Sequence, residues 1–150
     1  KADQAILYEK HFDQTIIDQV RWNPKFKKNI AFVYLGRKQD TSLSIQNFRD
    51  LDFTDADIKE ISQISEEFWL INHKEDLMEL MRDHEFHIGR ILNKTPVQNK
   101  LFSDFNGAIK SMGAWGGDFV MAVGNDKFKK TKKYFNNKGY ETVLSWDIIL

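Results

Sequence analysis

The chain has 150 residues, 41% of them hydrophobic and 13% aromatic, and its 22 basic and 22 acidic side chains cancel. These values are typical of one globular domain rather than a disordered tail, and the neutral charge disfavours nucleic acid or an anionic membrane as partner. The absence of cysteine excludes disulfides and thiolate zinc sites and fits a reducing cytoplasm. No apolar run approaches the roughly 20 residues of a spanning helix, and no signal peptide opens the chain.

The first half of the chain predicts strands followed by a helix. Residues 5–8 and 16–17 are short β-prone pieces, and residues 29–35 form a nearly continuous apolar run that is typical of a buried central strand. Thr54 and Asp57 then resemble a helix N-cap and its capping-box partner. The helix is expected to continue as one apolar stripe, which comprises Ile58, Ile61, Ile64, Phe68 and Ile71.

Two further helices are predicted before residue 107. The second runs from about Lys74 to Leu92, with an apolar face that comprises Leu77, Leu80, Met81, His84, Ile88, Ile91 and Leu92. The third opens at Thr95-Pro96, because proline tolerates the first helical position and Gln98 can complete a capping box with Thr95. Its core face comprises Val97, Leu101, Phe102 and Phe105.

The last part of the chain predicts a strand, a glycine loop and a strand over residues 108–123, then a helix over 126–138 and a strand over 142–146. Gly139 is the expected helix C-cap, and the lysines of that helix are expected on its solvent face. This order predicts an α+β fold: a ferredoxin-like two-layer sandwich, with an antiparallel or mixed sheet and helices packed mainly on one face.

The glycine loop is the most informative stretch, since it holds three of the eight glycines within five residues. Glycines this dense let the backbone adopt positive φ and bring N–H groups close to an anion such as phosphate. Tight turns use the same residues. From the residues alone, both a ligand loop and a turn stay open.

The run from Ala108 to Val120, AIKSMGAWGGDFV, resembles the third signature motif of the GHMP kinases, which include galactokinase, homoserine kinase, mevalonate kinase and phosphomevalonate kinase. The usual form is a lysine, an apolar residue, Thr or Ser, Gly-Ala-Gly-Gly-Gly-Gly and an apolar strand. Trp115 and Asp118 stand where glycine is usual. Segments 29–41, 81–97 and 138–143 are also similar to bacterial mevalonate kinase-like proteins, so the resemblance extends over nearly the full length.

The resemblance implies the C-terminal domain of such a kinase. A whole GHMP kinase is about twice this size, and its Pro-x-x-x-Gly-Leu-Gly-Ser-Ser phosphate loop lies in the N-terminal half. Neither Pro24 nor Pro96 starts such a loop, and the chain begins at Lys1. We therefore expect that the catalytic residues, and most contacts to ATP and Mg²⁺, belong to a missing N-terminal half. The implied reaction transfers the γ-phosphoryl group to a hydroxyl or phosphate acceptor, mevalonate being the best single guess, and the chain alone is expected to be inactive.

By this resemblance, the expected substrate- or phosphate-binding residues are Ser111, Gly113, Ala114, Trp115, Gly116, Gly117 and Asp118. Ser111 is expected to bind substrate or support the loop. Trp115 is expected to fold over a ligand or to anchor the loop against a partner domain. For Asp118 we favour a hydrogen bond to its own backbone over a contact with a substrate hydroxyl.

Lys110 and His84 are weaker candidates. Lys110 adds positive charge near the loop or is solvated at a strand end, which is the commoner case. His84 lies on an apolar helix face, where a core histidine is usual, although the resemblance places this part of the helix near the cleft. The histidines at 84 and 87 are three residues apart and have no evident third ligand, so we expect no metal site.

The expected partners are a small-molecule substrate and the protein's own N-terminal domain, and the sequence leaves a homodimer open. One rival interpretation is a non-catalytic ferredoxin-like module that binds a small ligand or a protein partner and regulates it. Another is an RNA-binding sheet, which would need exposed aromatic side chains and a basic surface, and which the neutral charge disfavours.

Overall fold

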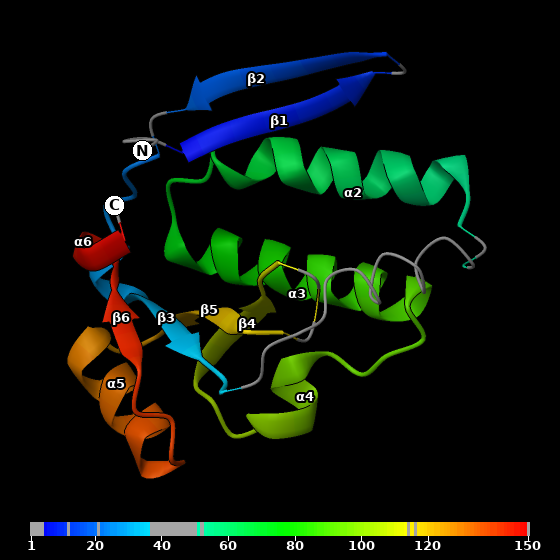
Figure 1. Ribbon diagram of the computed structural model, residues 1–150. Coiled ribbons are helices and arrows are strands. Elements are labelled where there is room, and N and C mark those ends of the chain that lie inside the picture. Colours follow the sequence, from blue (N-terminus) through cyan, green and yellow to red (C-terminus); the bar gives the residue numbers. More distant parts are fainter. Residues whose placement is uncertain are drawn as a thin grey trace.

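The computed structural model describes residues 5–11, 13–20, 22–36, 51, 53–113, 115 and 117–149, and it has the predicted α+β class (Figure 1). Its elements in chain order are β1 (Ala5–His11), β2 (Gln14–Val20), η1 (Lys27–Asn29), β3 (Ile30–Tyr34), α2 (Asp55–Phe68), α3 (Lys74–Ile91), α4 (Val97–Leu101), β4 (Gly107–Ser111), β5 (Phe119–Gly124), α5 (Phe128–Asn137), β6 (Val143–Ser145) and α6 (Trp146–Ile149).

The main sheet has four strands in the order β4-β5-β3-β6, and every pairing is antiparallel. β3 lies in the interior of the sheet, where Ile30 pairs with Val123 of β5 and Ala31 pairs with Ser145 of β6. Four of its five residues are buried, which confirms the prediction of a central strand. From β3 to β6 the elements are β3, α2, α3, α4, β4, β5, α5 and β6. With the three helices between β3 and β4 counted as one connection, this is the β-α-β-β-α-β order of the expected ferredoxin-like arrangement.

Helices cover both faces of this sheet, which corrects the expectation that they pack mainly on one. Ile30 and Phe32 of β3 belong to a core with Leu77 and Met81 of α3. The alternate β3 residues, Ala31 and Val33, belong to a second core that comprises Val97, Phe102, Phe105, Ile109, Val120, Ala122, Phe135 and Val143. Figure 1 shows α3 on one side of the sheet and α4 and α5 on the other. The physical reason is that β3 and β5 are apolar at every position and need cover on both faces.

The start of α2 follows the predicted capping box. Thr54 Oγ1 accepts a hydrogen bond from the Asp57 backbone N–H at 3.2 Å, and the Thr54 N–H donates to Asp57 Oδ2 at 2.8 Å. The predicted apolar stripe is only partly buried, because α2 packs on α3 instead of on the sheet. Ile64 is buried, whereas Ile58 is 51% exposed.

The capping box predicted for the third helix, between Thr95 and Gln98, is absent. The helix there is α4, its N-cap is Pro96, and no side chain caps it. Gln98 instead bonds the edge of β4: its Nε2 donates to Gly107 O at 3.2 Å and its Oε1 accepts from Ile109 N–H at 2.8 Å. The unpaired edge of β4 offers backbone groups that need partners, so the Gln98 amide serves the sheet rather than the helix.

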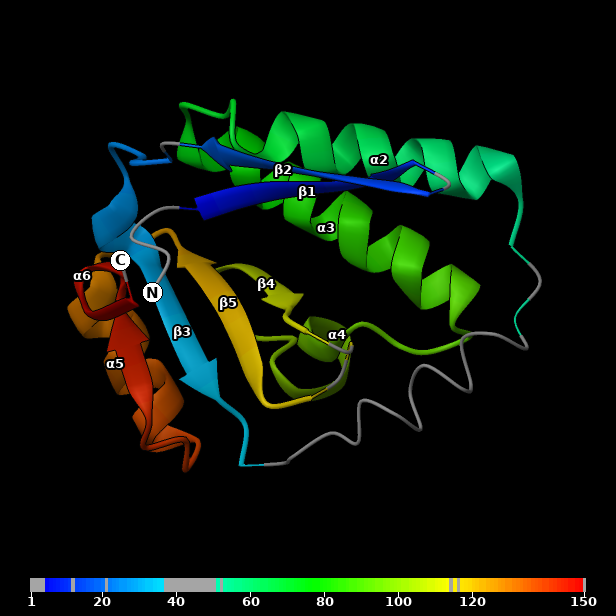
Figure 2. The ribbon, with the colours of Figure 1, turned by 45° about the horizontal axis from the view of Figure 1, so that its top comes forward.

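The two β-prone pieces near the start form one antiparallel hairpin, β1–β2, in which Ala5 pairs with Val20 and His11 with Gln14. The hairpin lies along α2, away from the main sheet (Figures 1 and 2). At the other end of the chain the predicted last strand is shorter than expected. It ends at Ser145, and Trp146 starts α6 with its ring buried against the α3 face of the sheet.

Candidate functional site

The glycine loop joins β4 to β5 and is closed at its base by backbone hydrogen bonds. Met112 N–H donates to Phe119 O at 3.1 Å, and Leu35 N–H donates to Asp118 O at 2.8 Å. Gly113 has a φ of +62°, and among the described residues, its chain neighbours aside, no atom lies within 4 Å of where its Cβ would be. The loop therefore combines a fixed base with open space beside Gly113, whereas Gly117 is buried. Ala114 and Gly116 lie outside the described residues.

A buried carboxylate holds this loop from inside the domain. Glu85 of α3 is only 2% exposed. Its Oε1 accepts from the Ser111 backbone N–H at 2.9 Å and from Trp115 Nε1 at 2.8 Å, and its Oε2 accepts from Ser111 Oγ at 3.1 Å. Both the start and the middle of the loop are thus tied to α3.

Glu85 is not among the site residues expected from the sequence, although the sequence carries a signal for it. Glu85 stands four residues after Met81, which places it on the buried face of α3, and a charge at such a position needs partners. Burial raises the pKa of Glu85, while the hydrogen bonds from Ser111 and Trp115 and the charge of Lys110 oppose that rise. The hydrogen-bond donors around the carboxylate therefore offset only part of the cost of removing its charge from water.

Two predicted loop residues serve this anchor. Trp115 is 9% exposed with a φ of 23°, and its indole is buried inside the chain. This corrects the expectation that it folds over a ligand or faces a partner domain, because the nearby Glu85 offers an acceptor for its N–H. Ser111 is also buried, and its hydroxyl bonds Glu85, so of its two expected roles the structure shows support of the loop.

Lys110 and His84 lie side by side at a different place, on the α3 face of the sheet. Lys110 Nζ donates to Ser111 O at 3.2 Å, and burial lowers its pKa although the charge of Glu85 opposes this. The expectation that Lys110 is solvated is therefore wrong. Burial, with smaller effects of Lys110 and His87, lowers the pKa of His84 to about 4, so its imidazole is neutral at pH 7.

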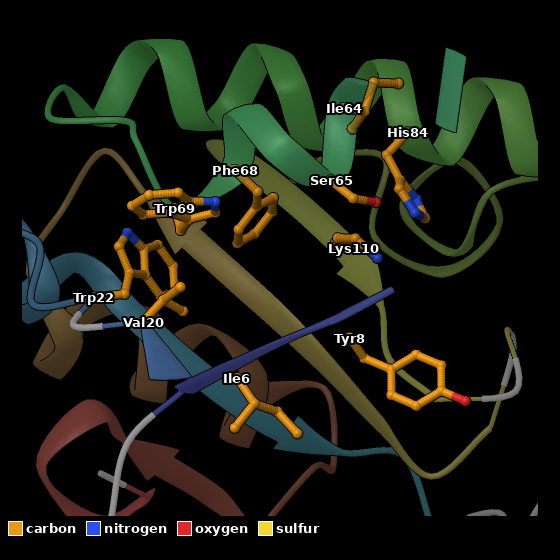
Figure 3. Close-up of a pocket in the computed structure, with 10 residues that line it drawn as sticks. All are labelled: Ile6, Tyr8, Val20, Trp22, Ile64, Ser65, Phe68, Trp69, His84 and Lys110. Carbon is orange, nitrogen blue, oxygen red and sulfur yellow. The ribbon is translucent and has the colours of Figure 1, made fainter. Parts of the chain in front are cut away.

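A cavity of about 410 Å³ lies between the β1–β2 hairpin, α2, α3 and β4 (Figure 3). Its size is within the range of small-molecule pockets, about 300–1,000 Å³. Among the described residues, Lys110 connects it to the glycine loop. The side chains that line it are Ile6, Tyr8, Val20, Trp22, Ile64, Ser65, Phe68, Trp69, His84 and Lys110.

The described residues hold no group of three His, Asp or Glu side chains that would bind a metal ion. Within the same part of the chain, no helix combines the length and the apolar character that crossing a membrane requires.

No family model and no curated protein matches this sequence. Among solved structures, the fold is similar to that of a Lin0012 protein from Listeria innocua, with a TM-score of 0.65 and 16% sequence identity. The match covers 87% of this chain but 41% of the Listeria chain, so this chain spans less than half the length of that protein. At this identity the likeness shows the fold alone.

Proposed function

We propose that this chain is the C-terminal domain of an ATP-dependent small-molecule kinase of the GHMP type, most like the mevalonate kinase-like proteins. The proposal rests on one observation: a glycine loop in the GHMP motif context is rigidly tied at its base and open at Gly113. In this proposal the loop faces the phosphoryl group or the acceptor, and the acceptor is a small molecule that carries a hydroxyl or a phosphate.

Phosphoryl transfer requires well-positioned reactants more than it requires reactive side chains. Phosphoryl transfer depends on holding donor and acceptor in line and on stabilising charge around the transferred group. Preorganised backbone N–H groups provide such stabilisation without reorganising during the reaction. Glu85 supplies the preorganisation, since its bonds to Ser111 and Trp115 keep the loop in one conformation.

The nucleotide belongs to the remainder of the protein in this proposal. ATP supplies the phosphoryl group and Mg²⁺ neutralises its phosphates. The described residues bring no three acidic or histidine side chains together, and in this proposal the Mg²⁺ ligands belong to the remainder of the protein. We accordingly expect no ATP turnover from residues 1–150 alone.

The test compares Gly113→Ala with Gly139→Ala in the intact protein. Both glycines have positive φ, +62° and +89°, and open space at the Cβ position, so alanine imposes a similar backbone strain of about 1 kcal/mol at each. Gly139 follows the C-cap of α5, far along the chain from the loop. With ATP, Mg²⁺ and a panel of small alcohols and phosphate esters, we expect Gly113→Ala to lower kcat/KM at least tenfold beyond Gly139→Ala at equal loss of Tm.

Equal activity losses for the two variants would make the loop a structural turn. The absence of turnover with every acceptor would instead favour the second candidate function, a non-catalytic module that binds a small ligand. The cavity beneath the hairpin is the observation that favours this alternative.

A further inference from the structure

The cavity beneath the β1–β2 hairpin has an aromatic end and a polar end. Figure 3 shows the rings of Trp22, Phe68 and Trp69 gathered at one end, where the centroids of Trp22 and Phe68 are 5.2 Å apart. At the other end the polar atoms of Lys110, His84 and Ser65 point toward one another. A ligand that matches this cavity therefore has an apolar body and a polar head.

At the polar end, the ammonium group of Lys110 can donate more hydrogen bonds than the one that it makes to a described residue. An ammonium group can donate three hydrogen bonds. In the described part of the chain, the one hydrogen bond of Lys110 Nζ is to Ser111 O. Lys110 is half-buried, and this burial lowers its pKa. A cation in such a place gains from an anionic partner more than a solvated one does, because the surrounding dielectric is low.

His84 adds an unused hydrogen-bonding atom at the same end. Its Nδ1 is buried and has no partner among the described residues. Buried polar atoms are nearly always paired, and exceptions ask for an explanation such as a ligand. The imidazole is neutral at pH 7, so it presents one donor and one acceptor nitrogen rather than a second charge.

We infer that this cavity binds a small amphipathic anion, with a carboxylate or phosphate head at Lys110 and His84 and a short apolar body against Trp22 and Phe68. Small-molecule sites have this composition, in which a few convergent polar groups stand on mainly apolar walls. The head contacts Lys110, and the body contacts the rings of Trp22 and Phe68, which are only partly buried.

The site goes beyond the proposed phosphoryl transfer, because none of the described residues of the glycine loop (Ser111–Gly113, Trp115, Gly117 and Asp118) lines the cavity. It is nevertheless next to the loop: Lys110 precedes Ser111, and His84 precedes Glu85, which anchors the loop. An anion bound at Lys110 thus lies one residue away from the groups that hold the loop.

Binding is measured on the intact protein without nucleotide, so a failed kinase assay does not affect the result. The probes are hexanoate, hexyl phosphate, 1-hexanol and inorganic phosphate. The readouts are titration calorimetry and tryptophan fluorescence, since Trp22 and Trp69 line the cavity. We expect saturable binding of one or both hexyl anions, the tighter of which identifies the head, at least tenfold weaker binding of 1-hexanol, and no fluorescence change with inorganic phosphate.

Two variants test the two ends separately. Lys110→Met removes the charge and keeps most of the side-chain volume, so it should weaken binding of the preferred anion at least tenfold and leave 1-hexanol within twofold. Lys100→Met, an exposed lysine of α4, is the matched control and should change neither. Val20→Phe fills the cavity and should weaken the hexyl anion and 1-hexanol alike.

Retained binding of 1-hexanol by Lys110→Met also shows that the variant is folded. The inference is overturned if neither hexyl anion saturates at millimolar concentration, if 1-hexanol binds as tightly as the anions, or if Lys110→Met binds the anion like the unmodified protein.

Discussion

Replacing Glu85 tests the anchor of the glycine loop most directly. Glu85→Leu removes the acceptor of three hydrogen bonds, from Ser111 N–H, Ser111 Oγ and Trp115 Nε1. Each buried donor left without a partner costs about 1–3 kcal/mol, which gives about 3 kcal/mol as the lower end of the sum. The variant no longer has to bury a charged carboxylate, which offsets part of the cost of the unpaired donors. We therefore expect the free energy of unfolding to fall by about 3–5 kcal/mol.

Glu85→Gln should behave differently, because the amide can keep all three bonds. Its oxygen can accept from Ser111 N–H and Trp115 Nε1, and its NH₂ group can donate to the Ser111 hydroxyl, which rotates to accept. The amide also carries no charge to dehydrate. We therefore expect Glu85→Gln to stay within about 1 kcal/mol of the unmodified protein.

The contribution of Glu85 to the stability of the protein should decrease as pH rises. Because the folded-state pKa of Glu85 is raised, its contribution to stability is fully present below the unfolded value near 4.5 and is lost as pH rises through the folded pKa. Glu85→Gln removes this loss, so its stability relative to the unmodified protein should increase as pH rises above 4.5.

The assay is urea and thermal unfolding of the intact protein, followed by circular dichroism. For a chain of this size, a loss of 3 kcal/mol corresponds to a fall in Tm of roughly 6–12 °C. Glu79→Leu, at an exposed position of the same helix, is the control and should stay within about 0.5 kcal/mol. A loss below 1 kcal/mol for Glu85→Leu, or equal losses for the Leu and Gln variants, would refute the anchor.

Three further predictions concern the capping box, the half-buried histidine and the core. Thr54→Ala should lower the free energy of unfolding in urea by about 1 kcal/mol. The Asp57 carboxylate contributes stability that is lost as pH falls from 3.8 toward its folded pKa of about 2, and Asp57→Asn should abolish this pH dependence; an unchanged acid-unfolding profile would contradict this. His84 should titrate by NMR with a pKa of about 4, and the stability that depends on its neutral form should decline as pH falls below 6.5; a titration near 6.5 would show that it is solvated. Phe102→Ala, at a position with no exposed surface, should cost about 3–5 kcal/mol, against a small effect for Phe86→Ala, where the ring is 63% exposed.

Part of the architecture follows from local patterns in the chain. β3 is apolar without interruption, the Thr54–Asp57 box starts α2, and Gly139 has the positive φ that a helix C-cap requires. Each of these depends on residues within a few positions of one another, so periodicity and capping chemistry suffice to predict them. The α+β class follows from the order of such elements.

Other features depend on contacts between residues far apart in the chain. Gln98 serves β4 rather than its own helix because the sheet edge lies beside it, and helices divide between two faces because both are apolar. The candidate sites belong to this class. Glu85 and Trp115 are thirty positions apart and meet only when α3 packs on the sheet.

By itself, the sequence determined the element types, the glycine loop and the motif it resembles, because these are properties of neighbouring residues. Only the tertiary structure decided that Trp115 points inward and that Lys110 and His84 share a cavity with aromatic rings from other parts of the chain. The reason is energetic: a buried charge or indole N–H goes where folding supplies its partner, and that partner comes from another element.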